Sequence, residues 1–187
     1  GQDAQIIQRV AQLAERRAAR EPLQYIAGVW DFLDFTLKVG PGVLCPRPDT
    51  EVVCEAAVEL LRGMDVPAPR VLDLCAGTGC LGLGVKRFVP PARVTCVEKS
   101  PAAFAYLQEN AANALAARGL AVEAVQADAM AYAAACPAGS VDLVVSNPPY
   151  LTAAEMADLQ PETAREPAMA LDGGADGLDF YRALAAA

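Results

Sequence analysis

Histidine is absent from the 187-residue sequence. Without imidazole the chain lacks the usual general base near neutral pH, which argues against a hydrolase triad. None of the six cysteines forms a C-x-x-C pair, so we expect free cytosolic thiols and no metal site. Whatever chemistry this protein performs is predicted to work without imidazole.

Long apolar runs and excess positive charge are also lacking. No run reaches the roughly 18 residues that a membrane span needs, and residues 1–5 do not resemble a signal peptide. The net charge of −8 argues against a nucleic-acid partner, since phosphate binding needs a basic face, and the basic cluster of the chain is Arg16, Arg17 and Arg20. We expect a soluble, cytoplasmic monomer that contacts neither membrane nor nucleic acid directly.

Apolar segments alternate with helical patterns from residue 70 onwards. Strands are predicted at 70–74, 93–97, 121–126 and 141–145, the last of them buried, with helices between them. This alternation predicts an α/β fold with a mostly parallel sheet and right-handed crossovers. Because four parallel strands followed by a lone helix from about residue 178 would be unusual, we expect C-terminal strands to be absent from this chain.

The N-terminal third has a different pattern. Helical spacing of apolar residues predicts one amphipathic helix over 2–20. Proline and glycine bracket a short extended piece over 21–28, period-two alternation predicts a β-hairpin over 30–39, and a short strand is expected over 43–45. A helix capped by Asp49 or Thr50 is expected to follow, with an apolar stripe that includes Val52 and Leu60, and to stop at Gly63.

A glycine loop joins the first of the four strands to a helix. Gly77-Thr78-Gly79-Cys80-Leu81-Gly82 matches G-x-G-x-x-G in the strand–loop–helix context that such loops require. Its glycines let a ligand approach backbone N–H groups at the helix start. Glu98, about twenty residues further at the next strand tip, is placed to bond a ribose diol. NAD and S-adenosylmethionine both carry that diol, so the loop alone does not choose between them.

Three other features favour S-adenosylmethionine. Asp73 lies at the strand end, where it could hold an ammonium group through a water or a backbone bridge. Asp128 ends the third strand, where it either reaches an adenine amine or is a solvated acid. The third feature is the turn after the fourth strand, which offers acceptors for a nitrogen nucleophile. No partner for the hydride transfer that NAD would require is evident.

That turn is Asn147-Pro148-Pro149-Tyr150, at the carboxyl end of a strand. Two consecutive prolines make it stiff and remove backbone donors. The Asn147 oxygen and the Pro148 carbonyl can accept both N–H bonds of a flat nitrogen group, on which the Tyr150 ring can stack. A rigid loop without function is the simpler alternative, and Arg47, between two prolines, is either a surface turn or a substrate contact.

Together these residues carry a family resemblance. Residues 73–79 with 147–150 resemble the class I methyltransferases that modify planar nitrogens, which include N6-adenine and protein glutamine N5 enzymes. The stretches PRPDTE at 46–51, EPAMALDGGADGL at 166–178 and EPLQYIAG at 21–28 are similar to the peptide chain release factor glutamine methyltransferases. The resemblance runs from about residue 16 onward.

The resemblance implies methyl transfer from S-adenosylmethionine, leaving S-adenosylhomocysteine, to the glutamine amide of a Gly-Gly-Gln tripeptide in class I release factors. It implies catalytic roles for Asn147, Pro148 and Tyr150. The substrate-binding residues that it implies are Arg47, Asn147, Pro148, Pro149 and Tyr150. The cofactor-binding residues that it implies are Asp73, Cys75, Ala76, Gly77, Thr78, Gly79, Glu98, Asp128, Ala129 and Asn147.

The same resemblance divides the chain. Residues 1–24 correspond to the remnant of a helical substrate-docking domain, 25–45 to a β-hairpin linker and 46–187 to a Rossmann-like methyltransferase domain, C-terminally incomplete. One departure concerns the residue after Asp128, where the family usually has Trp or Phe near the adenine and this chain has Ala129. Two alternatives remain: an N6-adenine nucleic-acid methyltransferase, and an NAD-dependent oxidoreductase or nucleotide-binding module.

Overall fold

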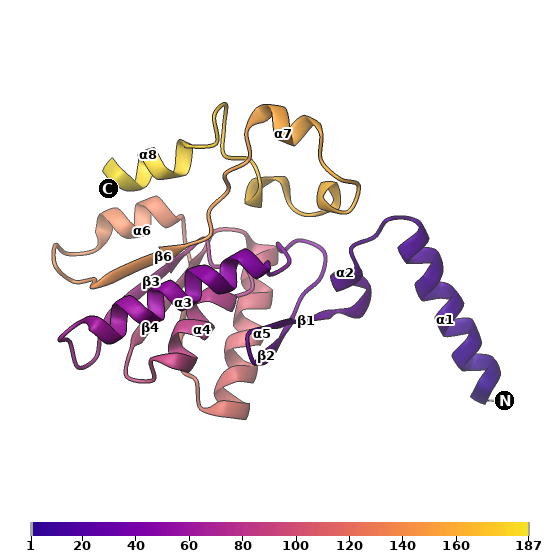
Figure 1. The fold of residues 1–187 in the computed structure, drawn as a ribbon, viewed down its shortest axis with the longest axis horizontal. Helices are drawn as coiled ribbons and strands as arrows, with labels where there is room; N and C mark the ends of the chain where they lie inside the picture. The colour runs from indigo at the N-terminus through magenta and orange to yellow at the C-terminus, as the bar shows by residue number, and fades with distance from the viewer. Residues whose placement is uncertain (1, 187) are drawn as a thin grey trace.

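The centre of the molecule is a four-stranded parallel sheet, which a computed structural model describes within residues 2–186 (Figure 1). Its strands are β3 (Arg70–Leu74), β4 (Arg93–Glu98), β5 (Glu123–Gln126) and β6 (Leu143–Ser146), in the order β5-β4-β3-β6. All pairings are parallel. The four strands and the α/β class predicted from the sequence are therefore confirmed.

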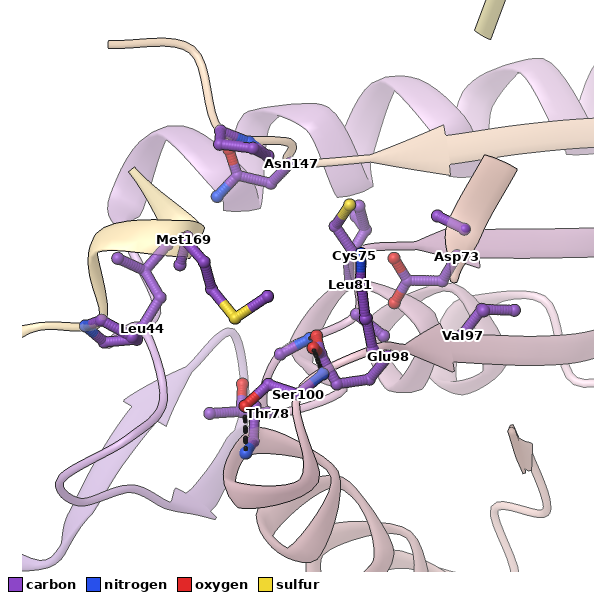
Figure 2. A pocket seen from close by; sticks show the side chains of 18 of the residues that line it. Leu44, Asp73, Cys75, Thr78, Leu81, Val97, Glu98, Ser100, Asn147 and Met169 are labelled. Carbon is purple, nitrogen blue, oxygen red and sulfur yellow. Dashed lines mark hydrogen bonds between the residues drawn. The ribbon is translucent and has the colours of Figure 1, made fainter. Parts of the chain in front are cut away.

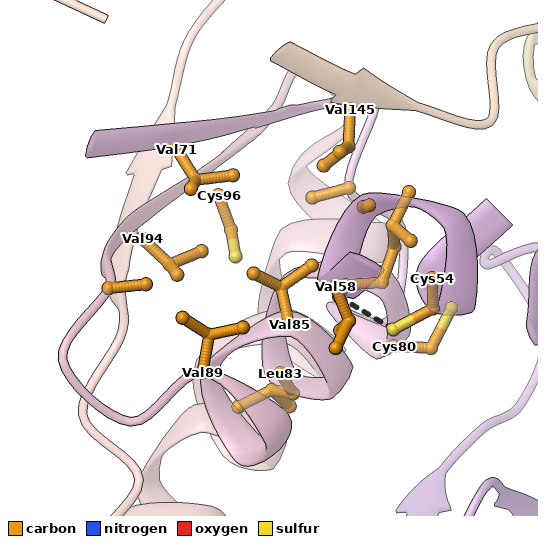
Figure 3. Close-up of a cluster of buried hydrophobic side chains, with 14 of the residues drawn as sticks. Cys54, Val58, Val71, Cys80, Leu83, Val85, Val89, Val94, Cys96 and Val145 are labelled. Atoms are coloured by element: carbon orange, nitrogen blue, oxygen red, sulfur yellow. Dashed lines mark hydrogen bonds between the residues drawn. The ribbon is translucent and has the colours of Figure 1, made fainter. Parts of the chain in front are cut away.

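Helices cover both faces of the sheet because successive side chains of a strand point to opposite sides. Val71 of β3 faces a core shared with α3 (Pro48–Gly63), α4 (Cys80–Phe88) and α5 (Pro101–Arg118). Leu72 and Leu74 face α6 (Ala129–Ala135) and α8 (Asp179–Ala186). Figure 3 shows the first core, in which Val71, Val94 and Val145 point from the strands towards Val85 and Val89.

The N-terminal part extends from this body as a helix and a hairpin. Helix α1 (Gln2–Ala18) lies away from the sheet in Figure 1 and exposes Ile6, Ile7 and Val10. The hairpin of β1 (Val29–Phe32) and β2 (Phe35–Lys38) is antiparallel, as predicted. Within residues 2–186 no helix is long and apolar enough to cross a membrane.

Several local predictions were wrong. The stretch expected to be extended forms α2 (Leu23–Ala27), which ends at Gly28 in the left-handed region. Residues 43–45 form no strand, although Val43 and Cys45 are buried. Helix α3 begins at Pro48, whose ring fixes the entry φ, and Arg47 at its N-cap makes no side-chain cap, because a guanidinium has no acceptor for the free N–H groups.

The buried faces also differ from those expected. Val52 and Leu60 of α3 are exposed, and Cys54 and Val58 point inwards beside Leu61, which was expected to be buried. The rotation of α3 is set by its contact with α4, where a Cβ added at Gly84 would lie 2.6 Å from the Cys54 sulfur. Strand β6 was expected to be buried, but it is an edge strand, and Val144 is 40% exposed.

The segment after β6 folds back towards the start of the domain. It contains α7 (Ala153–Ala157) and two 3-10 helices, η1 (Thr163–Arg165) and η2 (Ala168–Ala170). An isolated parallel bridge joins Leu151 to Asp172, and the Gly173 N–H donates to the Leu151 carbonyl at 2.8 Å. These contacts return residues 166–180 to the carboxyl edge of the sheet.

Candidate active site

A cavity of about 270 Å³ opens at the carboxyl edge of the sheet. Open α/β sheets place their ligands at this edge. Figure 2 shows Glu98 and Asn147 on opposite sides of the space, with Met169 from η2 beside it. The cavity therefore brings together the strand tip, the asparagine turn and a segment that the sequence analysis assigned only by resemblance.

The glycine loop forms one side of the cavity. Gly79, the N-cap of α4, has φ 82°, and a Cβ there would lie 2.6 Å from Leu107. Gly82 lies against β4 so closely that a Cβ would overlap the Cys96 sulfur. The loop thus needs glycine at 79 for its conformation and at 82 for close packing of helix and strand. Cys75, the residue that follows β3, also has a positive φ of 62°.

Glu98 is held by the backbone on both sides. Its Oε2 accepts the Gly77 N–H at 2.9 Å, and its Oε1 accepts the Ser100 N–H at 2.7 Å. Its exposed fraction is 9%. Each carboxylate oxygen has a second lone-pair direction, so the clamped side chain can still accept from hydroxyl groups. This geometry suits the predicted diol acceptor.

Asp73 lies deeper than its predicted contact with an ammonium group would suggest. It is 1% exposed, and its Oδ2 accepts the Gly82 N–H at 2.8 Å, so it ties β3 to the start of α4. Burial raises the pKa of the Asp73 carboxyl to about 7. The carboxyl lines the inner wall of the cavity, and an indirect contact with a ligand stays a prediction.

Asp128 caps α6 at the opening of the cavity. Its Oδ1 accepts the Met130 and Ala131 N–H groups, each at 3.0 Å, and its Oδ2 lies 3.1 Å from the Lys99 ammonium. The backbone bonds and the ammonium group together hold the pKa of this carboxyl below its usual range. The side chain is 45% exposed, so its predicted reach to an adenine amine remains open.

Aromatic surface next to Asp128 comes from another part of the chain. Ala129, a predicted cofactor-binding residue, lines the cavity, but it offers only a methyl group. Phe180 of α8 and Met130 line the same cavity, and both pack against the cluster that contains Ala129. Sequence reasoning missed both residues. The small side chain at 129 was the available signal that another element had to fill this place.

The asparagine turn begins where β6 ends. Ser146 Oγ donates to the Leu74 carbonyl at 2.5 Å, and Asn147 Nδ2 donates to Thr50 Oγ1 at 3.2 Å. Asn147 and Pro149 line the cavity. Pro148 is buried outside the lining, and Tyr150 is 53% exposed, so the structure places neither side chain in the cavity wall.

Arg47 is tied to the segment that folds back after β6. Its guanidinium pairs with Glu166 Oε1, and Glu166 Oε2 accepts the Cys45 N–H at 2.9 Å. The Glu166 side chain is only 3% exposed. Pro167 and Met169, which follow it, line the cavity. Following the roles predicted from the sequence, we use the name amide-side wall for the segments 44–50, 147–149 and 166–170, which contain both cavity-lining residues and the residues that support them. We use the name cofactor-side wall for the segments 73–79 and 98–100.

The cysteines near the cavity are not poised to ionise. Burial raises the pKa of the Cys75, Cys80 and Cys45 thiols to about 12. All six cysteines are free. In the part of the chain that the structure describes, no group of three or more acidic or cysteine side chains is arranged to hold a metal ion.

A parallel sheet with a glycine loop, an acidic strand tip and a polar turn at its carboxyl edge has the arrangement with which open α/β domains bind nucleotide-like ligands. Residues 37–172 match the methyltransferase small domain family. The chain belongs to this family.

Curated relatives and solved structures agree with this assignment. The chain is 42% identical over 185 residues to the release factor glutamine methyltransferase of Streptomyces coelicolor, covering 97% of this chain and 63% of the relative. It is 46% identical over 176 residues to the enzyme of that name from Mycolicibacterium smegmatis, covering 93% and 59%. The chain thus spans about three fifths of the length of these relatives.

Among solved structures, the 16S rRNA N2 G1207 methyltransferase of T. Thermophilus, solved with AdoMet and guanosine, is 28% identical. Its TM-score is 0.52 over 74% of this chain and 38% of that chain. The hMettl16 catalytic domain shares the fold, with 13% identity and a TM-score of 0.57 over 94% of this chain and 72% of that one.

Proposed function

We propose that this protein transfers a methyl group from S-adenosylmethionine to the side-chain amide nitrogen of a glutamine, in the Gly-Gly-Gln tripeptide of a class I release factor. The observation that carries the proposal is Asn147 at the cavity wall opposite Glu98. The names of the similar curated proteins support the choice of acceptor.

The donor set suits the cofactor. The two Glu98 oxygens are clamped at the strand tip and suit a ribose diol. Asp128 lies at the mouth, and the side chains of Met130 and Phe180 offer apolar surface for a flat ring. The family usually provides this adenine-side surface with an aromatic residue next to the acid at position 128. We assign that role here to Met130 of α6 and Phe180 of α8.

The chemistry needs positioning more than a strong base. When bound, S-adenosylmethionine supplies an electrophilic methyl carbon on a sulfur that leaves as a neutral thioether. We propose that Asn147 Oδ1 and the Pro148 carbonyl accept the two N–H bonds of the glutamine amide and hold its lone pair towards that carbon. The nitrogen forms the new bond to carbon and releases one proton to solvent. Positioning of this kind can lower a barrier by several kcal/mol, which fits a chain without histidine.

We assign residues 46–187 to the methyltransferase unit, 25–45 to a hairpin linker and 1–24 to a helical substrate-docking unit. Arg17 and Arg20 at the end of α1 each lie 2.8 Å from Glu162. The Arg165 guanidinium also donates to the Ala19 carbonyl. These contacts connect the proposed docking unit to the segment that continues into the amide-side wall.

A second candidate is methylation of an exocyclic base nitrogen in nucleic acid. It is favoured by the likeness to an rRNA N2-guanine methyltransferase, because such a nitrogen is also flat. The net charge of −8 disfavours it.

Incubation with tritium-labelled S-adenosylmethionine and either a release factor or oligonucleotides separates the candidates. We expect label in the release factor, and a loss of about 100-fold or more in Asn147→Ala and when the acceptor glutamine is replaced. Calorimetry should find S-adenosylmethionine affinity in Asn147→Ala within a few-fold of wild type. Label in the oligonucleotides, with none in the protein, would reject the proposal.

A further inference from the structure

Thr50 is a buried polar residue whose side chain contacts the asparagine turn. It is 3% exposed, in the first turn of α3, and lies 97 residues from Asn147 in sequence. Its backbone N–H donates to the Arg47 carbonyl at 3.0 Å, and Pro48 precedes it in the helix. Residue 50 is therefore held at a fixed place in the first turn of α3, next to the asparagine turn.

The contact orients the Asn147 carboxamide. Asn147 Nδ2 donates to Thr50 Oγ1 at 3.2 Å. In a planar carboxamide the oxygen and nitrogen point in different directions from the same carbon. A hydroxyl can donate as well as accept, so it is the observed Nδ2 contact with Thr50 that turns the oxygen away from it. The opposite orientation would present an NH2 group to an incoming NH2 group, and the two would repel.

The oxygen is left free for another partner. Among residues 2–186, no donor bonds Asn147 Oδ1, and no buried side-chain nitrogen or oxygen lacks a partner. An oxygen without a partner must therefore have accessible surface. Asn147 lines the cavity, which is where an acceptor amide has to sit.

We infer that Thr50 is a positioning residue, whose hydroxyl fixes the Asn147 amide with its oxygen towards the cavity. This inference rests on the proposed function for its catalytic consequence. Thr50 also lines the cavity, but the effect inferred here is exerted through Asn147, to which its hydroxyl is bonded.

The first measurement needs neither cofactor nor substrate. The chain has three asparagines, at 110, 113 and 147, so protein labelled with 15N-asparagine gives three side-chain NH2 signals in an NMR spectrum. Asn147→Ala identifies the signal of residue 147. We expect it to be shifted and slowly exchanging in wild type, to collapse towards a solvent-like position in Thr50→Val, and to be retained in Thr50→Ser. An unchanged Asn147 signal in a folded Thr50→Val variant would overturn the inference.

The second measurement is kinetic. We expect Thr50→Val to lower kcat by about 10–30-fold, with S-adenosylmethionine affinity within twofold of wild type and activity largely restored in Thr50→Ser. In an Asn147→Ala background, Thr50→Val should add no further loss. Thr95→Val, which removes a hydroxyl on β4 that bonds Glu123, is the matched control and should leave kcat unchanged.

The two readouts fail separately. If wild-type protein labels no release factor, the proposed function is rejected, and the NMR signal still decides whether Thr50 orients Asn147. If release factor is labelled but Thr50→Val keeps wild-type kcat, the role of Thr50 is rejected and the proposed function stands. Thermal denaturation identifies misfolded variants. If Thr50→Val does not fold, Thr50→Ser is the test variant, and a solvent-like Asn147 signal in Thr50→Ser would count against the inference.

Discussion

The two walls of the cavity are built in different ways. On the cofactor-side wall, Glu98 meets backbone N–H groups 21 and 2 residues away, and Asp73 meets one 9 residues away. On the amide-side wall, side chains meet partners 97, 119 and 121 residues away. A local pattern of glycines and strands can specify the first wall, whereas the second depends on the whole chain folding back correctly.

The largest effect is expected from a change that breaks the cofactor-side wall. Gly79→Ala places a side chain in the left-handed region and against Leu107. Backbone strain and overpacking should together lower the free energy of unfolding by about 3 kcal/mol and abolish S-adenosylmethionine binding. Gly63→Ala, where a Cβ meets nothing within 4 Å, is the control. Urea denaturation and calorimetry test both variants, and equal stability of the two would contradict the expectation.

A smaller effect is expected from a change confined to the amide-side wall. Glu166→Ala leaves the Arg47 guanidinium and the Cys45 N–H without their partner, and should cost about 2–3 kcal/mol of stability. If the walls are independent, KM for release factor should rise about tenfold, with S-adenosylmethionine affinity changed less than threefold.

Glu162→Ala is the control for Glu166→Ala because it also removes a carboxylate paired with arginines. Those arginine side chains are 46% and 51% exposed, so solvent screening should leave the stability of Glu162→Ala close to that of wild type. In Glu166→Ala, a loss of S-adenosylmethionine affinity as large as the rise in KM for release factor would show that the two walls are coupled.

The smallest effect concerns the proposed adenine side of the cavity, where α8 supplies the aromatic ring of Phe180. Phe180→Ala should weaken S-adenosylmethionine binding about fivefold to tenfold, since a partly buried aromatic contact of this kind contributes about 1 kcal/mol. Leu178→Ala, at a residue that is 46% exposed, should leave the affinity unchanged. Calorimetry with both variants measures the difference, and equal affinities would remove Phe180 from the cofactor site.

Local rules sufficed for the parallel sheet and the glycine loop. Strand, G-x-G-x-x-G and Glu98 follow one another within 30 residues, so short-range patterns fix both their order and their geometry. Ser100, a residue type that favours helix N-caps, caps α5 and accepts the Ala103 N–H. The hairpin that the structure shows at residues 29–38 was also predicted from the sequence, because alternation and turn residues are local signals.

The amide-side wall was harder to predict for a physical reason. Thr50 was expected to be a possible helix cap, yet Arg47 occupies the cap and the Thr50 hydroxyl bonds Asn147. Glu166 and Phe180 had no periodicity that distinguished them from surface residues. Their positions depend on tertiary contacts of α3, η2 and α8, and no rule about neighbouring residues contains that information.

The clamped Glu98 side chain has a consequence for binding. A glutamate on the surface samples many rotamers, and fixing them can cost up to about 2 kcal/mol. Here the Gly77 and Ser100 N–H groups impose one conformer while the chain folds. In the proposed role of Glu98, the hydroxyls of an arriving ribose would therefore meet an acceptor that is already preorganised, and the side chain would lose little entropy on binding.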